Sequence, residues 1–167
     1  MKSLSNHDII KFFDNKVNLV LYPEIRNIKN IEELLGPYNR CVILYKTSSN
    51  YGHWVCISLN SYGEIDFFDS YNLSPDLELK FIDNKTRSEL MQKTPYLSKL
   101  LIDSKYKINY NDHQFQKDNP KITTCGYWVI LRLTFKDLDA DEFINFIKTL
   151  ELDDTKIYNI INKIMKF

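Results

Sequence analysis

Three runs of β-branched and aromatic residues in the first half of the chain constrain its fold more than any other feature. They cover residues 40–45, 53–59 and 64–69, and residues of these types favour strands. The last two runs are separated only by residues 60–63, a short polar segment with a glycine that is typical of a hairpin loop. The sequence therefore predicts a small sheet in which these two strands are antiparallel neighbours.

Helical patterns precede and follow these strands. Residues 5–8 can cap a short helix with apolar side chains at 9–13, and Asn30 begins a capping-box pattern that ends at Gly36. Two short helices should therefore come before the sheet. In the C-terminal helices at 139–167, Asp139 and residues 153–155 are the candidate N-caps of two amphipathic segments.

The middle of the chain has a more mixed pattern. Residues 72–105 contain two prolines and predict a loop followed by a helix, whereas residues 105–111 alternate polar with apolar and predict a strand. Residues 117–121 predict a loop. We expect an α+β fold with a small central antiparallel or mixed sheet flanked by helices, in a single domain over residues 1–167.

Size and charge narrow the functional classes. A chain of 167 residues is expected to form one domain that buries about two-thirds of its unfolded surface. Its 22 basic and 22 acidic residues balance, so it lacks the basic footprint of a nucleic-acid-binding protein. The first residues are polar and the apolar runs stop after about five residues, so we expect neither a secretory signal nor a membrane span.

The three cysteines point to a reducing compartment. Cys41, Cys56 and Cys125 lie far apart and form no CxxC pair, which argues against a zinc site or a disulfide framework. We expect no metal and no cofactor. Cys41 and Cys56 fall inside predicted strands, where a thiol is most often a small buried apolar group.

Cys125 occupies a different kind of position. It follows two threonines and precedes Gly126, at the predicted first turn of a helix that continues over residues 127–135. Unpaired backbone N–H groups and the positive end of the helix dipole favour a thiolate there, and the same N–H groups can donate to an oxyanion. The pattern predicts a cysteine nucleophile, which also needs an imidazole base within reach.

His53 and Asp69 are the candidates for that base and its orienting carboxylate. His53 begins one strand of the predicted hairpin and Asp69 ends the other, so antiparallel pairing brings the two together. A carboxylate on the far side of the ring would hold its tautomer and stabilise its cation. Taken alone, each residue also has a purely structural interpretation, since His53 could simply begin a strand and Asp69 could cap a turn.

The ordered set of motifs resembles a known family, the viral maturation cysteine proteases of the adenain type and the related SUMO-type proteases. The motifs are His53-Trp54, the segment 67–71 that contains Asp69-Ser70, and Thr124-Cys125-Gly126, in that order within residues 28–135. The turn after Asp69 looks closest to proteases of large DNA viruses, virophages and polinton-like elements.

This resemblance implies further site residues. A glutamine of the family donates its side-chain amide to the oxyanion, and Gln114 and Gln116 both qualify here. We favour Gln116, because it is nearer Cys125 and is expected at the end of the strand that contains Tyr110-Asn111. Trp54 is similar to a tryptophan that forms the wall of a narrow substrate channel, although core packing is an equal alternative, and Gly126 would let the substrate backbone approach.

The resemblance also implies a function. We expect an endopeptidase that cuts virion precursor proteins after small, glycine-type residues. A ubiquitin-like-protein isopeptidase and an inactive protease-like binding module are the alternatives. Its partners would be a polypeptide substrate and, by resemblance only, an activating peptide or DNA, with Cys41 able to pair with a cysteine of such a peptide. We expect a monomer without a membrane partner, in the virion or the host cytoplasm or nucleus.

Overall fold

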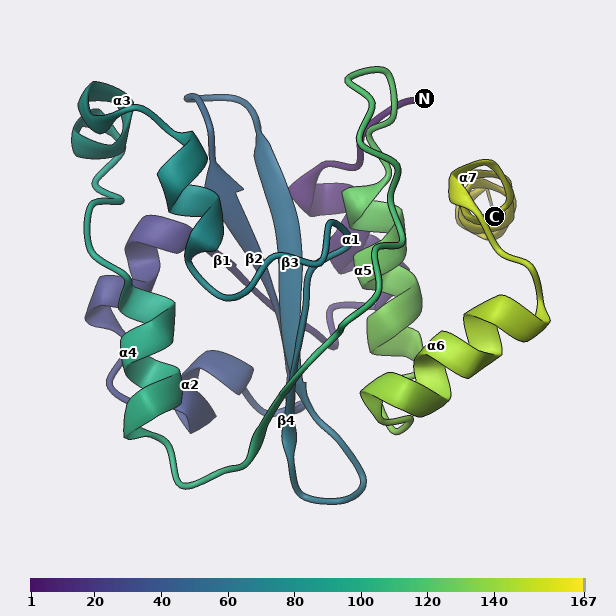
Figure 1. Cartoon of the computed structure of the whole chain (residues 1–167), viewed down its shortest axis with the longest axis horizontal. Helices are drawn as coiled ribbons and strands as arrows, with labels where there is room; N and C mark the ends of the chain where they lie inside the picture. Colours follow the sequence, from purple (N-terminus) through teal and green to yellow (C-terminus); the bar gives the residue numbers. More distant parts are fainter. Residues whose placement is uncertain (167) are drawn as a thin grey trace.

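A five-stranded mixed sheet forms the centre of the protein in the computed structural model, which describes residues 1–166 (Figure 1). The strands lie side by side in sequence order. The first and last pairs are parallel and the two pairs between them antiparallel. The strands are β1 (Asn18–Leu21), β2 (Arg40–Lys46), β3 (Gly52–Leu59), β4 (Ile65–Phe68) and β5 (Ile108–Tyr110).

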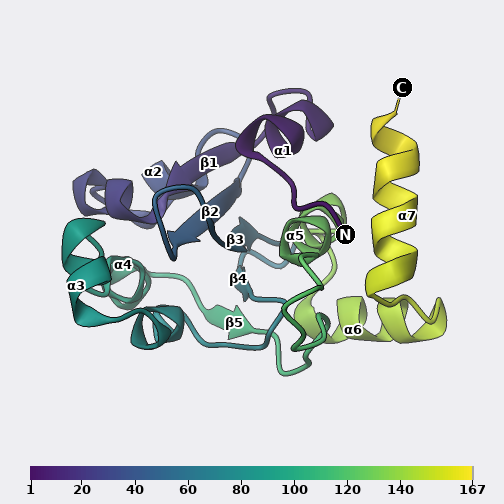
Figure 2. The same ribbon diagram turned by 90° about the horizontal axis from the view of Figure 1, so that it is seen from above.

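Helices cover both faces of this sheet (Figure 2). One face packs against α1 (Asn6–Phe12), α5 (Cys125–Thr134), α6 (Ala140–Thr149) and α7 (Asp154–Met165). The other face packs against η1 (Tyr22–Asn27), α2 (Ile31–Leu35), η2 (Leu77–Phe81) and α4 (Tyr96–Asp103), and α3 (Asn84–Glu89) lies beyond them.

Alternation along the strands divides the apolar side chains between these two cores. Cys56 and Phe68 belong to the core around α5, whereas Val55, Ile57 and Phe67 belong to the core around α4. Successive side chains of a strand point to opposite faces, so a strand that is covered on both sides needs an unbroken apolar run. This is why the predicted strands carry apolar runs rather than alternating polar residues.

The helix α5 lies at the centre of the larger core. Its residues from Cys125 to Leu133 are all buried, and it packs against β3. A helix that is apolar all round must be enclosed by other elements. Its first residue, Cys125, lines the same cavity as His53 of β3.

The predicted helix caps are confirmed. Ser5, Asn30, Asp139 and Asp153 are the N-caps of their helices, and each accepts a backbone N–H of the first turn. Gly36 ends α2 with a φ of 68°, a left-handed conformation that favours glycine. The capping side chains thus define where these helices begin.

Three expectations about the elements are corrected. The strand β1 lies between the first two predicted helical segments, and a run of four residues carries too little periodicity to be recognised. The strand predicted at 105–111 is only Ile108–Tyr110, and residues 72–105 contain three short helices rather than one. Within residues 1–166, every helix is too short or too polar to traverse a bilayer.

Candidate active site

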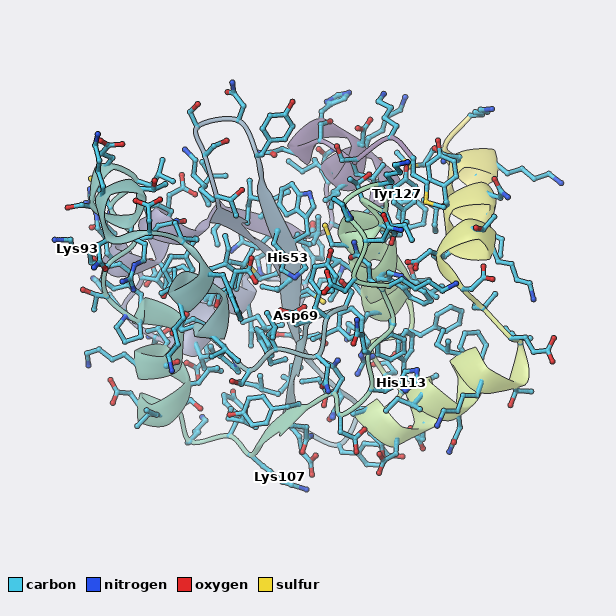
Figure 3. The ribbon with its side chains drawn as sticks, turned by 45° about the horizontal axis from the view of Figure 1, so that its top comes forward. His53, Asp69, Lys93, Lys107, His113 and Tyr127 are labelled. Carbon is cyan, nitrogen blue, oxygen red and sulfur yellow. The ribbon has the colours of Figure 1, made fainter. Side chains whose placement is uncertain are left out.

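The side chains of His53 and Asp69 form the centre of the site (Figure 3). His53 lies near the start of β3 and Asp69 directly after β4, and Nε2 of the ring is 2.8 Å from Oδ1 of the carboxylate. Both residues are buried. Asn111 clamps the turn, because its Oδ1 accepts the Asp69 N–H at 3.0 Å and its Nδ2 donates to the Asp69 carbonyl at 2.7 Å.

The surroundings of the ring favour its protonated form. Burial lowers the pKa of His53, but the negative charge of Asp69 and the hydrogen bond to it act in the other direction. A hydrogen bond with the side chain of Cys125 raises it as well, and the net result is a pKa well above the ordinary histidine value. The ring is therefore suited to be an imidazolium that faces a carboxylate and a thiolate.

Cys125 is the thiol that shares a cavity with this ring. It is the first residue of α5 and lines the same cavity as His53, and its side chain raises the pKa of that histidine. Because Nε2 is engaged by Asp69, Nδ1 is the ring nitrogen left for the thiol. Cys41 and Cys56 are buried as predicted, and burial raises the pKa of both thiols, which leaves them unreactive.

The two glutamines lie in different places. Gln116 is buried and lines the cavity. Its side-chain oxygen Oε1 accepts a hydrogen bond from the Ser70 hydroxyl at 2.9 Å. The amide of Gln114 donates instead to the main-chain carbonyl of Gln116 at 2.8 Å, and Gln114 is not part of the cavity wall.

The prediction that Gln116 stands at the end of a strand is wrong. The strand β5 ends at Tyr110, so neither glutamine belongs to it. The backbone N–H groups of Phe115 and Gln116 both donate to the Ser70 carbonyl, at 2.9 and 3.0 Å. The turn that follows Asp69, rather than a strand end, therefore positions Gln116.

The cavity beside these residues has a volume of about 440 Å³. Its walls come from the N-terminal segment, the β2–β3 connection, the turn after β4 and the loop before α5. The lining residues are Ser3, Leu4, Ser5, Asn6, Leu44, Thr47, Asn50, Tyr51, Gly52, His53, Trp54, Tyr71, Glu78, Gln116, Ile122, Thr123 and Cys125. His53 and Cys125 therefore line one cavity.

Trp54 and Gly126 meet at the N-terminal segment. Trp54 lines the cavity but is only 4% exposed, and its indole N–H donates to the Leu4 carbonyl at 3.2 Å. A Cβ on Gly126 would lie 3.2 Å from both Leu4 Cβ and Trp54 Cδ1, and Gly126 is not part of the wall. Close packing against Leu4 and Trp54 therefore accounts for this glycine, and its contact with substrate stays a prediction.

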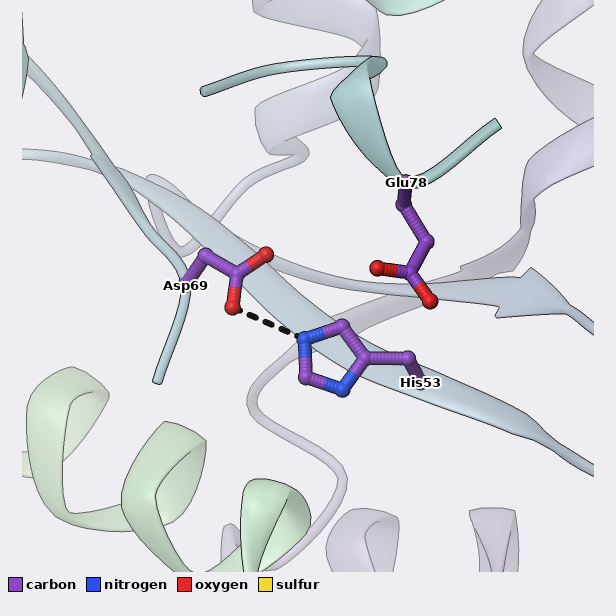
Figure 4. Close-up of side chains that lie close together, drawn as sticks. All are labelled: His53, Asp69 and Glu78. Atoms are coloured by element: carbon purple, nitrogen blue, oxygen red, sulfur yellow. Dashed lines mark hydrogen bonds and ion pairs between the residues drawn. The ribbon is translucent and has the colours of Figure 1, made fainter. Parts of the chain in front are cut away.

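Two cavity residues were not anticipated. Tyr71 stacks on His53, with ring centroids 5.0 Å apart and an angle of 28° between the planes. Glu78 of η2 brings its carboxylate to the same ring (Figure 4). Burial raises the pKa of Glu78, with His53 lowering it and Asp69 raising it further. Tyr71 could have been found from its place beside Asp69-Ser70, whereas nothing in the sequence around Glu78 signals its position.

His53, Asp69 and Glu78 also have the spacing of metal ligands. Among residues 1–166, they offer ligand atoms that all lie within 4.8 Å of one another. However, Nε2 of His53 is already hydrogen-bonded to Asp69, and the second nitrogen is the one left for Cys125. The arrangement therefore fits a charge-stabilised imidazolium better than a metal centre.

Asp154 anchors the loop that leads to Cys125. Its buried carboxylate accepts the hydroxyl of Thr124, the indole N–H of Trp128 at 2.9 Å and the backbone N–H of Lys117 at 3.0 Å. The sequence suggested only a helix cap at residues 153–155. The cap is Asp153, and Asp154 instead joins α7 to the start of α5.

Comparisons with known proteins agree with this architecture. No protein-family model matches the chain. The ASFV pS273R protease superposes with a TM-score of 0.54 at 17% identity, over 95% of this chain and 66% of that one, and a second structure of it gives a TM-score of 0.52 at 15% identity, over 96% and 66%. The likeness to the SUMO protease Ulp1 is weaker, with a TM-score of 0.48 at 17% identity, over 98% of this chain and 76% of that one.

The chain thus shares the fold of the ASFV pS273R protease, a mixed sheet with flanking helices as the sequence predicts, although it spans only 66% of that protease. A sequence relative places the chain more closely. The uncharacterized protein V9 of Sputnik virophage is 43% identical over 145 residues, which cover 87% of this chain and 83% of the relative. The chain belongs to the same family as this virophage protein.

Proposed function

We propose that this chain is a cysteine protease in which Cys125, His53 and Asp69 are the catalytic residues. One observation carries the proposal, namely that a buried histidine bonded to a carboxylate shares one cavity with a thiol whose side chain also raises the pKa of the ring. Two such partners are what a thiolate–imidazolium pair requires. The fold shared with a viral protease supports the same conclusion.

The reaction would proceed through a covalent intermediate. The Cys125 thiolate attacks the scissile carbonyl carbon, and the carbonyl π electrons move to oxygen. The backbone N–H at the start of α5 and polar side chains of the cavity wall at Gln116 and Tyr71 stabilise this oxyanion. Protonated His53 then gives its proton to the leaving amine as the C–N bond breaks, and afterwards takes a proton from the water that hydrolyses the thioester.

The substrates we propose are precursor proteins of a virus particle, cut after small residues. The virophage relative and the fold shared with a viral protease favour a viral substrate. Trp54 and Leu4 are hydrogen-bonded to each other in the cavity wall, and they would form the narrow part of a channel that admits small side chains. Free buried cysteines are compatible with action in a virion or in a reducing host compartment.

Mass spectrometry of digests tests this proposal. The chain is incubated with candidate virion precursor proteins and, separately, with fusions of ubiquitin-like modifiers. Cys125→Ala should abolish cleavage, while Cys41→Ala, which removes a thiol outside the cavity, should retain it if the variant stays folded. Cleavage of modifier fusions alone would replace the maturation role by an isopeptidase role. Cleavage by Cys125→Ala at the rate of the unaltered chain would overturn the proposal.

A further inference from the structure

Tyr71 is held against His53, in the wall of the cavity that Cys125 also lines. Its ring stacks on His53, and its backbone N–H donates to Oδ1 of Asp69 at 2.8 Å. The same Asp69 oxygen is bonded to the His53 ring, so one carboxylate oxygen fixes both residues. The side chain of Tyr71 lines the cavity together with Cys125 and Gln116.

Gln116 has no amide proton left for a substrate. Its Nε2 carries two protons, of which one is donated to the Tyr71 hydroxyl at 3.0 Å and the other to the Ile122 carbonyl at 2.9 Å. Its oxygen accepts the Ser70 hydroxyl at 2.9 Å. The whole carboxamide is therefore engaged within the protein, and direct donation to an oxyanion would require one of these bonds to break.

The hydroxyl of Tyr71, in contrast to the Gln116 amide, still has a proton to donate. It accepts from Gln116, and within residues 1–166 its own proton has no acceptor. A hydroxyl that accepts a hydrogen bond becomes a better donor. Burial raises the pKa of Tyr71 to about 12, and the nearby charge of Cys125 contributes, so the hydroxyl stays protonated at neutral pH.

We infer that the Tyr71 hydroxyl is a donor of the oxyanion hole, and that Gln116 is a positioning residue that acts through it. The inference rests on the proposed function. When sulfur bonds to the scissile carbon, the negative charge on oxygen takes a hydrogen bond from Tyr71 Oη–H and one from the N–H of Cys125. No proton leaves Tyr71, and the carbonyl re-forms as the C–N bond breaks. The ligand it recognises is the carbonyl oxygen of a peptide bond.

Kinetics of Tyr71→Phe test the inference, because this change keeps the ring and removes only the hydroxyl. With a fluorogenic peptide amide that carries Gly-Gly before the scissile bond, kcat should fall roughly a hundredfold with little change in KM. Gln116→Ala should lower kcat similarly, and the double variant should lose little more than either single one, since the two act in series. Tyr62→Phe is the matched control, since it removes an exposed hydroxyl that bonds to Glu142.

A structural role of Tyr71 is separated from donation by tuning the phenol. Fluorinated tyrosines at position 71 keep the stack on His53 but change the acidity of the hydroxyl, so kcat should follow the phenol pKa. A near-normal kcat of Tyr71→Phe alongside a large loss in Gln116→Ala would overturn the inference and leave the protease proposal intact. If the unaltered chain neither cleaves the peptide nor reacts with the matching peptide aldehyde, the proposed function itself fails.

Discussion

At the scale of single residues, the environment of His53 determines what the site can do. The ring is buried, its Nε2 is bonded to Asp69, and a second carboxylate, that of Glu78, lies close by. An isolated imidazole in such a place would be neutral, because burial disfavours the charged form. The Asp69 carboxylate and the side chain of Cys125 reverse this preference, so the folded protein prepares an imidazolium before substrate arrives.

Titration of His53 by NMR checks whether its neighbours favour the protonated ring. Its ring resonance should titrate well above the ordinary value of about 6.5, and in Asp69→Asn the pKa should fall, because the charge and hydrogen bond that raise it are gone. His53 therefore contributes stability that is complete below the unfolded pKa and is lost as pH rises through the folded pKa.

The other histidines provide the control for this titration. His7 and His113 are not part of the cavity wall, and their ring resonances should have the same chemical shifts in both proteins. An unchanged His53 titration in Asp69→Asn would show that Asp69 does not control the ring.

Site residues that belong to recognisable sequence motifs could be predicted from the sequence. The order of the motifs and the hairpin predict His53, Asp69 and Cys125, and the structure places His53 and Cys125 in one cavity and bonds Asp69 to the His53 ring. Tyr71 and Glu78 were missed because their roles depend on side-chain directions across a turn and a short helix. Gln116 was chosen for an incorrect reason, since a turn and not a strand positions it.

At the scale of elements, the first turn of α7 supports the start of α5. Asp154 accepts from three donors, which belong to Lys117, Thr124 and Trp128. These donors lie on both sides of the loop that connects Gln116 to Cys125. A buried carboxylate with three partners therefore ties the proposed nucleophile to an element outside the catalytic core.

A pair of adjacent aspartates tests this support. Asp154→Asn leaves one acceptor oxygen for three donors, two of them in buried bonds, so the free energy of unfolding should drop by about 1–3 kcal/mol, as for an unsatisfied buried polar group. Asp153→Asn is the control, because asparagine caps helices as well as aspartate does. Urea denaturation measures both, and equal losses from the two variants would contradict the special role of Asp154.

Elements with local signals were predicted, and those with only tertiary signals were not. Capping side chains such as Ser5 and Asp139 mark helix starts by themselves. The strand β1 is stabilised by parallel pairing with β2, in which Val20 lies opposite Ile43. No pattern inside four residues reports a partner that lies more than twenty residues along the chain.

At the scale of the whole molecule, one buried ion pair links the sheet to the helices. Arg132 of α5 lies 3.0 Å from Asp66 of β4, and both side chains are almost fully buried. Asn60 and Asn109 also donate to Asp66, and the Arg132 guanidinium lies over the ring of Phe143. The pair therefore holds β4, α5 and α6 in one arrangement, with the His53–Cys125 geometry at the other end of the same helix.

Removing one partner of this pair should cost much more than removing an exposed one. Arg132→Met leaves the Asp66 carboxylate buried without its counter-ion, and the free energy of unfolding should fall by about 3–5 kcal/mol. Lys107→Met, which breaks the exposed pair with Glu64, is the control and should cost less than about 1 kcal/mol.

The loss of stability in Arg132→Met should depend on pH. Burial already raises the pKa of Asp66, while Arg132 lowers it, so the pKa should rise further in Arg132→Met. Above that pKa the folded variant holds an uncompensated buried charge, and below it the folded state binds a proton that the unfolded chain does not. Thermal unfolding at a series of pH values should therefore show the deficit of Arg132→Met shrinking as pH falls. A deficit independent of pH would mean that lost packing of Arg132 against Phe143, rather than the charge of Asp66, explains the destabilisation.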